Sequence, residues 1–245
     1  MNRMILLAPD PFGILTKTLF FKLRKNMSHK KNIGKIEPFE LFSREYDDWF
    51  IKNKDKYELE LRTIRSFIPV NSNVMEVGVG SGKFAVPLGI KTGIDPSCKM
   101  AERAKKSGIK VIRGIAEELP FSGNCFDFIL MVTTICFVDN IKKTFKEAAR
   151  VLKKDGFIVI GFVDKESKLG KEYISKKDKS KFYKTANFFS TKEVLVCLSE
   201  TGFENFEIKQ TLFPENNEPA IKDGFGKGSF VVIKGKKGNN VQWMK

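Results

Sequence analysis

Residues 74–82 read VMEVGVGSG, and this stretch decides the fold of the chain. A short apolar run that carries one acid, Glu76, is followed by three glycines at alternate positions. Glycine permits a tight turn after a strand and lets a ligand approach the backbone closely, because it has no Cβ. A second short strand pattern ends in Asp95, 19 positions after Glu76, where nucleotide-binding α/β folds hold the ribose hydroxyls. The stretch therefore predicts a nucleoside-binding site.

Three better-known glycine motifs do not fit this stretch. The dinucleotide fingerprint needs a glycine where Lys83 stands, and the P-loop needs serine or threonine where Phe84 stands. The nucleophile elbow of hydrolases needs a glycine where Val79 stands. The remaining pattern is Glu-x-Gly-x-Gly-x-Gly.

The loop and four later segments resemble the class I S-adenosylmethionine-dependent methyltransferases. In the family's order the five segments are EVGVGSG (76–82), DPS (95–97), GIAEELPF (114–121), FDFILMV (126–132) and ARVLKKDGF (149–157). The likeness covers about residues 39–236 and is nearest to the type 11, ubiquinone/menaquinone-type methyltransferases, in a bacterial and archaeal branch. The resemblance implies S-adenosylmethionine (SAM) as co-substrate.

The resemblance also implies which residues bind SAM. The predicted donor-binding residues are Glu76, Gly78, Val79, Gly80, Gly82, Asp95, Pro96, Met100, Ala116, Glu117 and Met131. In this set Asp95 would bind the ribose hydroxyls, and Met100 would cover the adenine. The aspartate usual in the family after its third strand is replaced by Ile115, so Glu117 or the backbone of Ala116 would hold the adenine edge.

The methyl acceptor is expected to be a small molecule. Methyl transfer from a sulfonium is an in-line displacement, for which alignment supplies much of the rate, so no catalytic triad is required. Candidate catalytic residues are Thr133, Thr134 and Tyr46, and candidate acceptor-binding residues are Tyr46, Trp49, Phe137 and Tyr183. The region after the fourth strand lacks the Asn/Asp-Pro-Pro-aromatic motif of enzymes that methylate base nitrogens. It also lacks the Pro-Cys nucleophile of RNA-cytosine methyltransferases, because Ile135 precedes Cys136. Specific nucleic-acid binding is therefore disfavoured.

The charge of the chain keeps an RNA methyltransferase open as an alternative. The formal net charge is +15 over 245 residues. Residues 1–35 hold eight basic side chains against one acid, and residues 165–184 hold eight against three. A basic surface is a weak indication of nucleic-acid binding. A basic amphipathic segment at 12–25 could equally contact a membrane surface weakly. An NAD(P)-binding oxidoreductase on the same fold is a further alternative, and the oligomeric state stays open.

Cysteine and histidine usage argue against a metal site. Four cysteines lack the close spacing of metal ligands or redox pairs, which predicts free thiols and a reducing, cytoplasmic location. The single histidine, His29, excludes most histidine-ligated metals and any histidine-based triad. No stretch reaches the ~18 apolar residues that a membrane span requires.

The alternation of strand and helix patterns predicts an α/β fold with a doubly wound, mostly parallel sheet and an N-terminal helical cap. The resemblance implies seven strands, the last one antiparallel. We expect strands near 74–77, 91–94, 110–112, 126–132, 157–162, 206–210 and 229–234, and helices from 83, 97, 141 and 190. The predicted organisation is a basic extension (1–35), a cap helix (36–69), the methyltransferase domain (70–236) and a basic tail (237–245).

Overall fold

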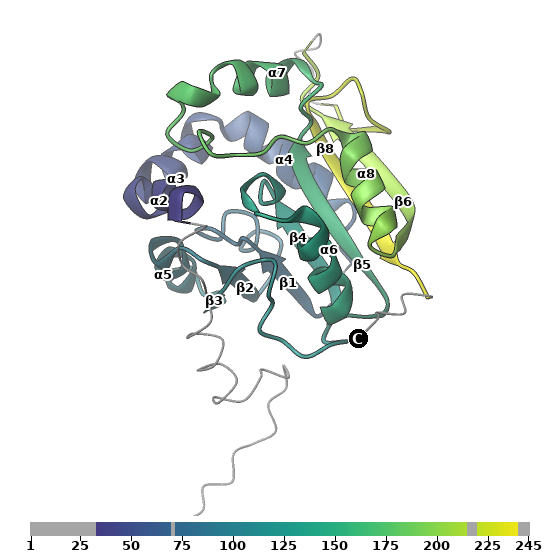
Figure 1. Cartoon of the computed structure of the whole chain (residues 1–245). Helices are drawn as coiled ribbons and strands as arrows, with labels where there is room; N and C mark the ends of the chain where they lie inside the picture. The colour runs from purple at the N-terminus through teal and green to yellow at the C-terminus, as the bar shows by residue number, and fades with distance from the viewer. Residues whose placement is uncertain (1–32, 70–71, 215–219, 240–245) are drawn as a thin grey trace, which may run out of the picture.

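An eight-stranded sheet forms the centre of the structure, a computed structural model that describes residues 33–69, 72–214 and 220–239 (Figure 1). The strands are β1 (Val74–Val77), β2 (Thr92–Asp95), β3 (Lys110–Arg113), β4 (Phe126–Val132), β5 (Leu152–Val163), β6 (Phe203–Thr211), β7 (Lys222–Asp223) and β8 (Phe230–Lys237). Their order is β3-β2-β1-β4-β5-β8-β6-β7. The first five run parallel, and β8 is antiparallel to β5 and β6. The carboxyl ends of β1, β2 and β4 therefore meet at one edge, where such sheets bind ligands.

The predicted doubly wound sheet is confirmed, with one strand more than the seven expected. The additional strand is β7, a two-residue strand that pairs with the end of β6. Strand β5 also begins earlier than the predicted start at Phe157. Leu152 already pairs with Phe126, and a register shift follows before Phe157 pairs with Phe128.

Helices cover both faces of the sheet, with α6 and α8 in front and α4 behind in Figure 1. The described helices are α2 (Ile33–Leu41), α3 (Ser43–Lys52), α4 (Lys54–Arg65), α5 (Cys98–Lys106), α6 (Ile141–Val151), α7 (Lys168–Ser175) and α8 (Thr191–Glu200), with short 3-10 turns η1 (Ile135–Phe137) and η2 (Lys177–Lys179). Each face carries its own apolar cluster, and residues 129–132 are all buried, as the wholly apolar run predicts. None of the helices in the described ranges combines the length and apolar content needed to cross a bilayer.

The predicted single cap helix is three helices, because the chain leaves the helical conformation at Phe42 and at Asn53. The side-chain amide and the backbone N–H of Asn53 both donate to the Trp49 carbonyl, a local hydrogen-bond pattern that competes with helix continuation. As a result α2 and α3 lie over the carboxyl edge of the sheet, while α4 packs on β5, β6 and β8.

Helix α2 begins at Ile33, inside the predicted basic extension. The rest of that extension, with the possible membrane-contacting segment at 12–25, lies outside the described residues. So does most of the predicted basic tail, residues 240–245.

Three of the predicted helix starts are confirmed by their capping residues. The side chains of Ser97, Asn140 and Ser190 accept backbone hydrogen bonds at the first turns of α5, α6 and α8. Ser190 also forms the predicted capping box with Glu193.

The predicted helix from Lys83 does not form. Isolated turns follow the glycine loop, such as the bond from the Val86 amide to the Gly82 carbonyl (3.0 Å). Pro87 offers no N–H, and Gly89 adopts φ +74°, so a regular helix cannot continue. In contrast, the lysine-rich stretch 165–184 contains α7, which the sequence pattern did not predict.

Candidate functional site: a cavity at the carboxyl edge of the sheet

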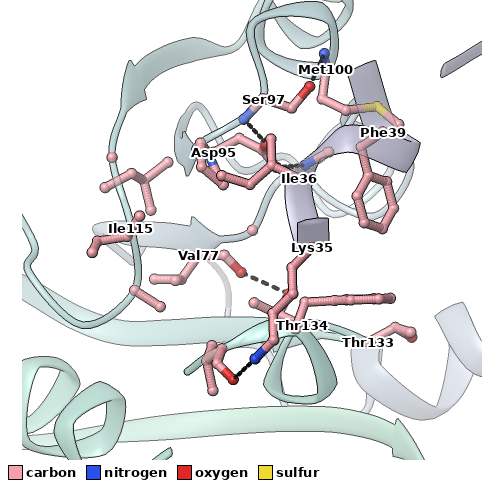
Figure 2. Close-up of a pocket in the computed structure, with 18 of the residues that line it drawn as sticks. Lys35, Ile36, Phe39, Val77, Asp95, Ser97, Met100, Ile115, Thr133 and Thr134 are labelled. Atoms are coloured by element: carbon pink, nitrogen blue, oxygen red, sulfur yellow. Dashed lines mark hydrogen bonds between the residues drawn. The ribbon is translucent and has the colours of Figure 1, made fainter. Parts of the chain in front are cut away.

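A cavity opens at the carboxyl edge of the sheet beneath α2 and α3 (Figure 2). About 810 Å³ of empty space, part of it open to solvent, lies between its wall residues. The predicted donor-binding residues on its wall are Gly78, Gly80, Asp95, Pro96, Met100, Ala116 and Glu117. The predicted catalytic or acceptor residues on its wall are Tyr46, Thr133, Thr134 and Phe137. One cavity thus brings together residues from five separate segments of the chain.

Gly78 and Gly80 shape the wall through backbone conformations that other residues rarely adopt, with φ of +72° and +56°. A Cβ added to Gly78 would lie 2.5 Å from Cγ2 of Thr134. A Cβ added to Gly80 would lie 3.3 Å from the Tyr46 hydroxyl. Only bare backbone therefore fits between β1 and these side chains.

Asp95 joins the glycine loop to the start of α5. Its Oδ2 accepts a hydrogen bond from the Gly80 amide and its Oδ1 accepts one from the Ser97 amide, both at 2.8 Å. Burial raises the pKa of Asp95 to about 6, against the opposing effect of these two bonds. A carboxylate offers about four acceptor positions, so Asp95 keeps roughly two for ligand hydroxyls.

Glu76 lies behind the glycine loop and not on the cavity wall, with 1% of its surface exposed. Its Oε2 has no hydrogen-bond partner within the described chain. Burial, and then the nearby Asp95 charge, raise the pKa of Glu76 well above its usual range. A buried carboxyl oxygen without a partner is costly, and a cationic group bound at the loop would reduce that cost.

Three other predicted donor residues support the cavity from behind. Val79 packs against Gly93 of β2, where an added Cβ would lie 2.7 Å from the valine side chain. Gly82 faces the α5 side of the loop. Met131 lies in the core cluster beneath α6 and α8, while its neighbour Val132 lines the cavity.

Glu117 lines the cavity, but its carboxylate accepts hydrogen bonds from the backbone ahead of the next helix. Its Oε1 accepts the backbone amides of Asp139 (2.6 Å) and Asn140 (3.2 Å) ahead of α6. Negative charge is favourable at a helix N-terminus. Glu117 therefore fixes the loop after β4, and an adenine contact through it stays a prediction.

The two candidate threonines hold the end of β4 in place. Thr133 adopts φ +51°, unusual for a β-branched residue, and its amide donates to the Gly161 carbonyl of β5 (2.8 Å). The Thr134 hydroxyl lies 3.1 Å from the carbonyls of both Val77 and Val132. Because its one proton is directed at backbone oxygens, Thr134 acts in the first place as a structural residue.

Cys136 is a buried thiol that donates to the Thr133 carbonyl (3.3 Å). Burial raises the pKa of the Cys136 thiol to about 12. The thiolate is the nucleophilic form of cysteine, so Cys136 is not poised for covalent attack on a base.

The candidate acceptor residues form two layers of aromatic rings. Phe39 of α2 packs edge-on against Tyr46 (5.8 Å between centroids) and Phe137 (5.0 Å) at the cavity wall. Tyr183 stacks behind Phe137 at 6.0 Å and 12°. Trp49 does not line the cavity and packs against the core on the α4 side.

Two polar side chains hold α2 over the cavity. The Lys35 ammonium donates to the Val138 carbonyl (2.8 Å) and pairs with the Asp139 carboxylate (2.9 Å). The Glu40 carboxylate accepts the Cys98 amide at the N-terminus of α5.

Asp47 fastens α3 to the glycine loop. Its carboxylate accepts the Ser81 hydroxyl (2.5 Å) and the Nε–H of Arg103 on α5 (2.7 Å). Lys83 adds an ion pair at 3.7 Å. The cap and the loop are therefore joined through one side chain.

We expect Asp47→Ala to loosen α3 from the loop and to speed the dissociation of a ligand bound beneath it. Losing a partly buried charged contact of about 1.4 kcal/mol corresponds to a roughly tenfold faster dissociation rate. Stopped-flow measurement of S-adenosylhomocysteine release tests this, with the exposed neighbour Asp48→Ala as control. Equal release rates in the two variants would show that Asp47 does not restrain the cap.

Glu60 of α4 is another buried acid, 7% exposed, and it makes no hydrogen bond or ion pair within the described ranges. Burial raises the pKa of Glu60 to about 8, and the charge of Lys56 on the same helix lowers it in part. The hydroxyls of Tyr46, Tyr173 and Tyr183 are close enough for the Glu60 charge to raise their pKa values further, beyond the effect of burial.

The stability of the protein should therefore depend on pH through Glu60. Between pH 4.5 and about 8 the unfolded chain releases a proton that folded Glu60 retains, so the free energy of unfolding falls as pH rises through this window. Glu60→Gln removes that loss, which is about 1.4 kcal/mol for each pKa unit. Urea unfolding at pH 5, 6.5 and 8 should show the variant gaining stability relative to wild type. An unchanged difference across pH, as expected for the exposed control Glu58→Gln, would contradict the assignment.

Several cavity residues were not predicted from the sequence. They are Lys35, Ile36, Phe39, Val77, Ile94, Ser97, Gly114, Ile115 and Val138. Ser97 could have been predicted, because it is the expected helix cap and lies only two positions after Asp95. Lys35, Ile36 and Phe39 come from α2, whose fold over the cavity depends on the break at Phe42.

Comparisons with known proteins agree with this geometry. A family model described as a methyltransferase domain matches residues 75–160. An uncharacterized protein of Methanocaldococcus jannaschii is 46% identical over 202 residues, 81% of this chain and 98% of that protein. The ubiquinone/menaquinone biosynthesis C-methyltransferase of Rickettsia rickettsii is 33% identical over 194 residues, 70% of this chain and 75% of that protein. A solved Thermotoga maritima SAM-dependent methyltransferase, described as a possible histamine N-methyltransferase, is 48% identical with a TM-score of 0.80, over 83% of this chain and 99% of that one.

The chain belongs to the class I SAM-dependent methyltransferases, in the type 11 family. It is a methyltransferase, and SAM is its co-substrate. The residues present fit that donor: Asp95 offers acceptors for a ribose diol, and the unpartnered Oε2 of Glu76 offers an acceptor to a cationic group bound at the loop. No cluster of potential metal ligands occurs among the described residues.

Proposed function

We propose that this enzyme methylates a small-molecule acceptor bound beneath α2 and α3, with SAM bound along the glycine loop. The observation that carries the proposal is the cap over the cavity, which Lys35, Glu40 and Asp47 fasten to the loop after β4, to α5 and to the glycine loop. A site roofed in this way suits a compact acceptor better than a folded RNA. Cys98, Cys136 and Cys197 are free thiols, which fits a cytoplasmic enzyme.

Each donor-side residue has a distinct role in this proposal. Asp95 accepts hydrogen bonds from the ribose hydroxyls while it holds the Gly80 amide in place. Met100 and Ala116 line the adenine side of the cavity. The unpartnered Oε2 of Glu76, behind the loop, accepts a hydrogen bond from the ammonium group of the donor.

The chain's part in the reaction is alignment and exclusion of water. SAM supplies an electrophilic methyl group, which passes to a nucleophilic atom of the acceptor as S-adenosylhomocysteine leaves. Phe39, Tyr46 and Phe137 form the apolar wall against which the acceptor is held. Thr133 and Thr134 fix the end of β4 beside that wall, and alignment of this kind accounts for a large part of the rate.

Calorimetric titration with SAM and S-adenosylhomocysteine tests the donor half of the proposal, and micromolar affinity is expected. A screen with methyl-labelled SAM tests the acceptor half. Because the T. maritima relative is described as a possible histamine N-methyltransferase, small amines belong in the first set of acceptors. Methyl transfer to RNA alone, with a steep salt dependence, would overturn the small-molecule assignment.

A further inference from the structure

Thr133 has an unfavourable backbone conformation on the wall of the cavity. Five non-glycine residues have a positive φ in the part of the chain that the structure describes, and three of them are asparagine or aspartate, which tolerate this conformation best. Thr133, with φ +51°, is the β-branched residue among the five and the one that lines the cavity. Backbone strain of this kind is retained mainly at functional sites, so it points to a function of Thr133.

Hydrogen bonds of the backbone hold Thr133 in this conformation. Its amide donates to the Gly161 carbonyl of β5 (2.8 Å), and its carbonyl accepts the Cys136 thiol (3.3 Å). The Thr133 hydroxyl has no hydrogen-bond partner among the described residues, whereas the Thr134 hydroxyl lies 3.1 Å from two carbonyls. Of these two neighbours, Thr133 is therefore the one whose hydroxyl remains available to a ligand.

Thr133 lies at the end of the cavity away from the segment that resembles an adenine-binding one. Figure 2 shows Thr133 and Phe39 at one side of the cavity and Ile115 of that segment at the other. The Tyr46 hydroxyl also lacks a partner in the described ranges, but it lies over the glycine loop, 3.3 Å from a Cβ added to Gly80. Thr133 thus offers an available hydroxyl at the acceptor end.

The titratable residues of the described cavity wall are poorly suited to remove a proton from an acceptor. They are Lys35, Tyr46, Asp95 and Glu117. Lys35 is paired with the Asp139 carboxylate, and burial raises the pKa of Tyr46 far above the neutral range. Asp95 is assigned to the donor ribose, and the Glu117 carboxylate accepts two backbone amides ahead of α6. An acceptor bound here therefore attacks with a lone pair of its own while it keeps its proton.

We propose that the Thr133 hydroxyl accepts a hydrogen bond from the N–H of a neutral amine acceptor and thereby directs the nitrogen lone pair at the methyl group of SAM. The inference rests on the proposed function, because it names the reacting atom and the substrate class of the same site. An alcohol or a phenol would have to lose its proton in order to react, and the described wall offers no base placed for that step.

The transfer then needs no proton acceptor on the protein. The nitrogen lone pair forms the N–C bond while the C–S bond breaks, and the electrons of that bond leave with the sulfur of S-adenosylhomocysteine. The product is an N-methylammonium ion, which releases its proton to water after it leaves the site. Alignment of the lone pair with the methyl group is the contribution of Thr133 to the rate.

The test measures transfer of a labelled methyl group from SAM by wild type, Thr133→Val and Thr133→Ser. Valine keeps the β-branched shape and removes the hydroxyl, whereas serine keeps the hydroxyl. The probes are three pairs of matched shape: 4-ethylaniline and 4-ethylphenol, benzylamine and benzyl alcohol, and 2-phenylethylamine and 2-phenylethanol. We expect wild type to methylate at least one amine faster than its hydroxyl counterpart. Thr133→Val should lower kcat/KM for that amine about 30-fold, because its N–H loses a partner, and Thr133→Ser should retain most of the activity.

Donor binding distinguishes this role from a purely structural one. Calorimetry should give affinities for S-adenosylhomocysteine that agree within about threefold in the three proteins, since about 0.7 kcal/mol covers the loss of a hydroxyl that does not touch the donor. Urea unfolding checks that the variants fold.

Three results would overturn the inference while leaving the proposed function intact. The first is an equal kcat/KM for the amine in wild type and Thr133→Val. The second is methyl transfer to the hydroxyl probes alone, or to none of the amines, by wild type that binds S-adenosylhomocysteine. The third is a loss of donor affinity in Thr133→Val as large as the loss of transfer. Failure of wild type to bind S-adenosylhomocysteine would overturn the proposed function and this inference together.

Discussion

Gly78→Ala should abolish measurable SAM binding, whereas Gly89→Ala should leave it near the wild-type value. Both glycines have left-handed φ angles, +72° and +74°. Alanine at either position thus carries the same conformational penalty of about 1–2 kcal/mol. Their surroundings differ, because the Gly78 Cβ would press into the Thr134 side chain and the Gly89 Cβ would meet no atom within 4 Å.

Thr134 cannot yield to this clash without moving the active site. Its hydroxyl is bonded to the carbonyls of Val77 and Val132, at the ends of β1 and β4. Displacing Thr134 therefore shifts both strand ends that line the cavity. We expect at least a ~100-fold loss of affinity for S-adenosylhomocysteine, or about 2.7 kcal/mol. Calorimetry measures this loss of affinity, and urea unfolding checks that both variants fold. Equal affinity in the two alanine variants would refute the argument that Gly78 is required by the close approach of Thr134.

Asp95→Ala should weaken both SAM and S-adenosylhomocysteine about 30-fold or more, since hydrogen bonds to a charged group contribute roughly 1.5–3 kcal/mol each. The substitution also removes the acceptor that holds the Gly80 and Ser97 amides, so the loop loses its anchor. Calorimetry against the exposed control Asp48→Ala measures the effect. Affinity unchanged from that control would remove Asp95 from the donor site.

The same residue gives the donor affinity a pH dependence. Because burial raises the pKa of Asp95 to about 6, its carboxylate form, which accepts ribose hydrogen bonds, is lost as pH falls below that value. Affinity for S-adenosylhomocysteine should therefore be lower at pH 5 than at pH 7.5 in wild type. This difference should disappear in Asp95→Ala.

Local sequence signals predicted the strands, the turn and the helix cap around the glycine loop well. The turn after β1, the acid that ends β2 and the cap at Ser97 depend on residues close together in the chain. Gly78 and Gly80 have the left-handed φ angles for which glycine is expected at such turns. These features needed no knowledge of the packing between distant segments.

The direction of a buried side chain could not be predicted in the same way. Met131 and Val132 are equally apolar, and both faces of the parallel sheet are covered by helices, so periodicity does not distinguish them. Only the packing places Met131 in the cluster beneath α6 and α8, and Val132 in the cluster of the other face, where it also lines the cavity.

The roles of acidic side chains were also hard to predict, because they depend on partners far away in the sequence. Glu117 stood in a segment similar to an adenine-binding one, yet its carboxylate binds amides more than 20 positions later in the chain. Glu60 gave no signal at all, since an acid on an amphipathic helix is usually exposed. Its burial follows from the break at Asn53, which turns α4 onto the sheet.

The most direct test of the central claim is a crystal structure of the protein grown with saturating S-adenosylhomocysteine. We predict the nucleoside in the cavity bounded by Gly78, Gly80 and Asp95, with its ribose at the Asp95 carboxylate. An empty cavity at saturating ligand, or NAD bound across the same glycine loop in a parallel soak, would contradict the account.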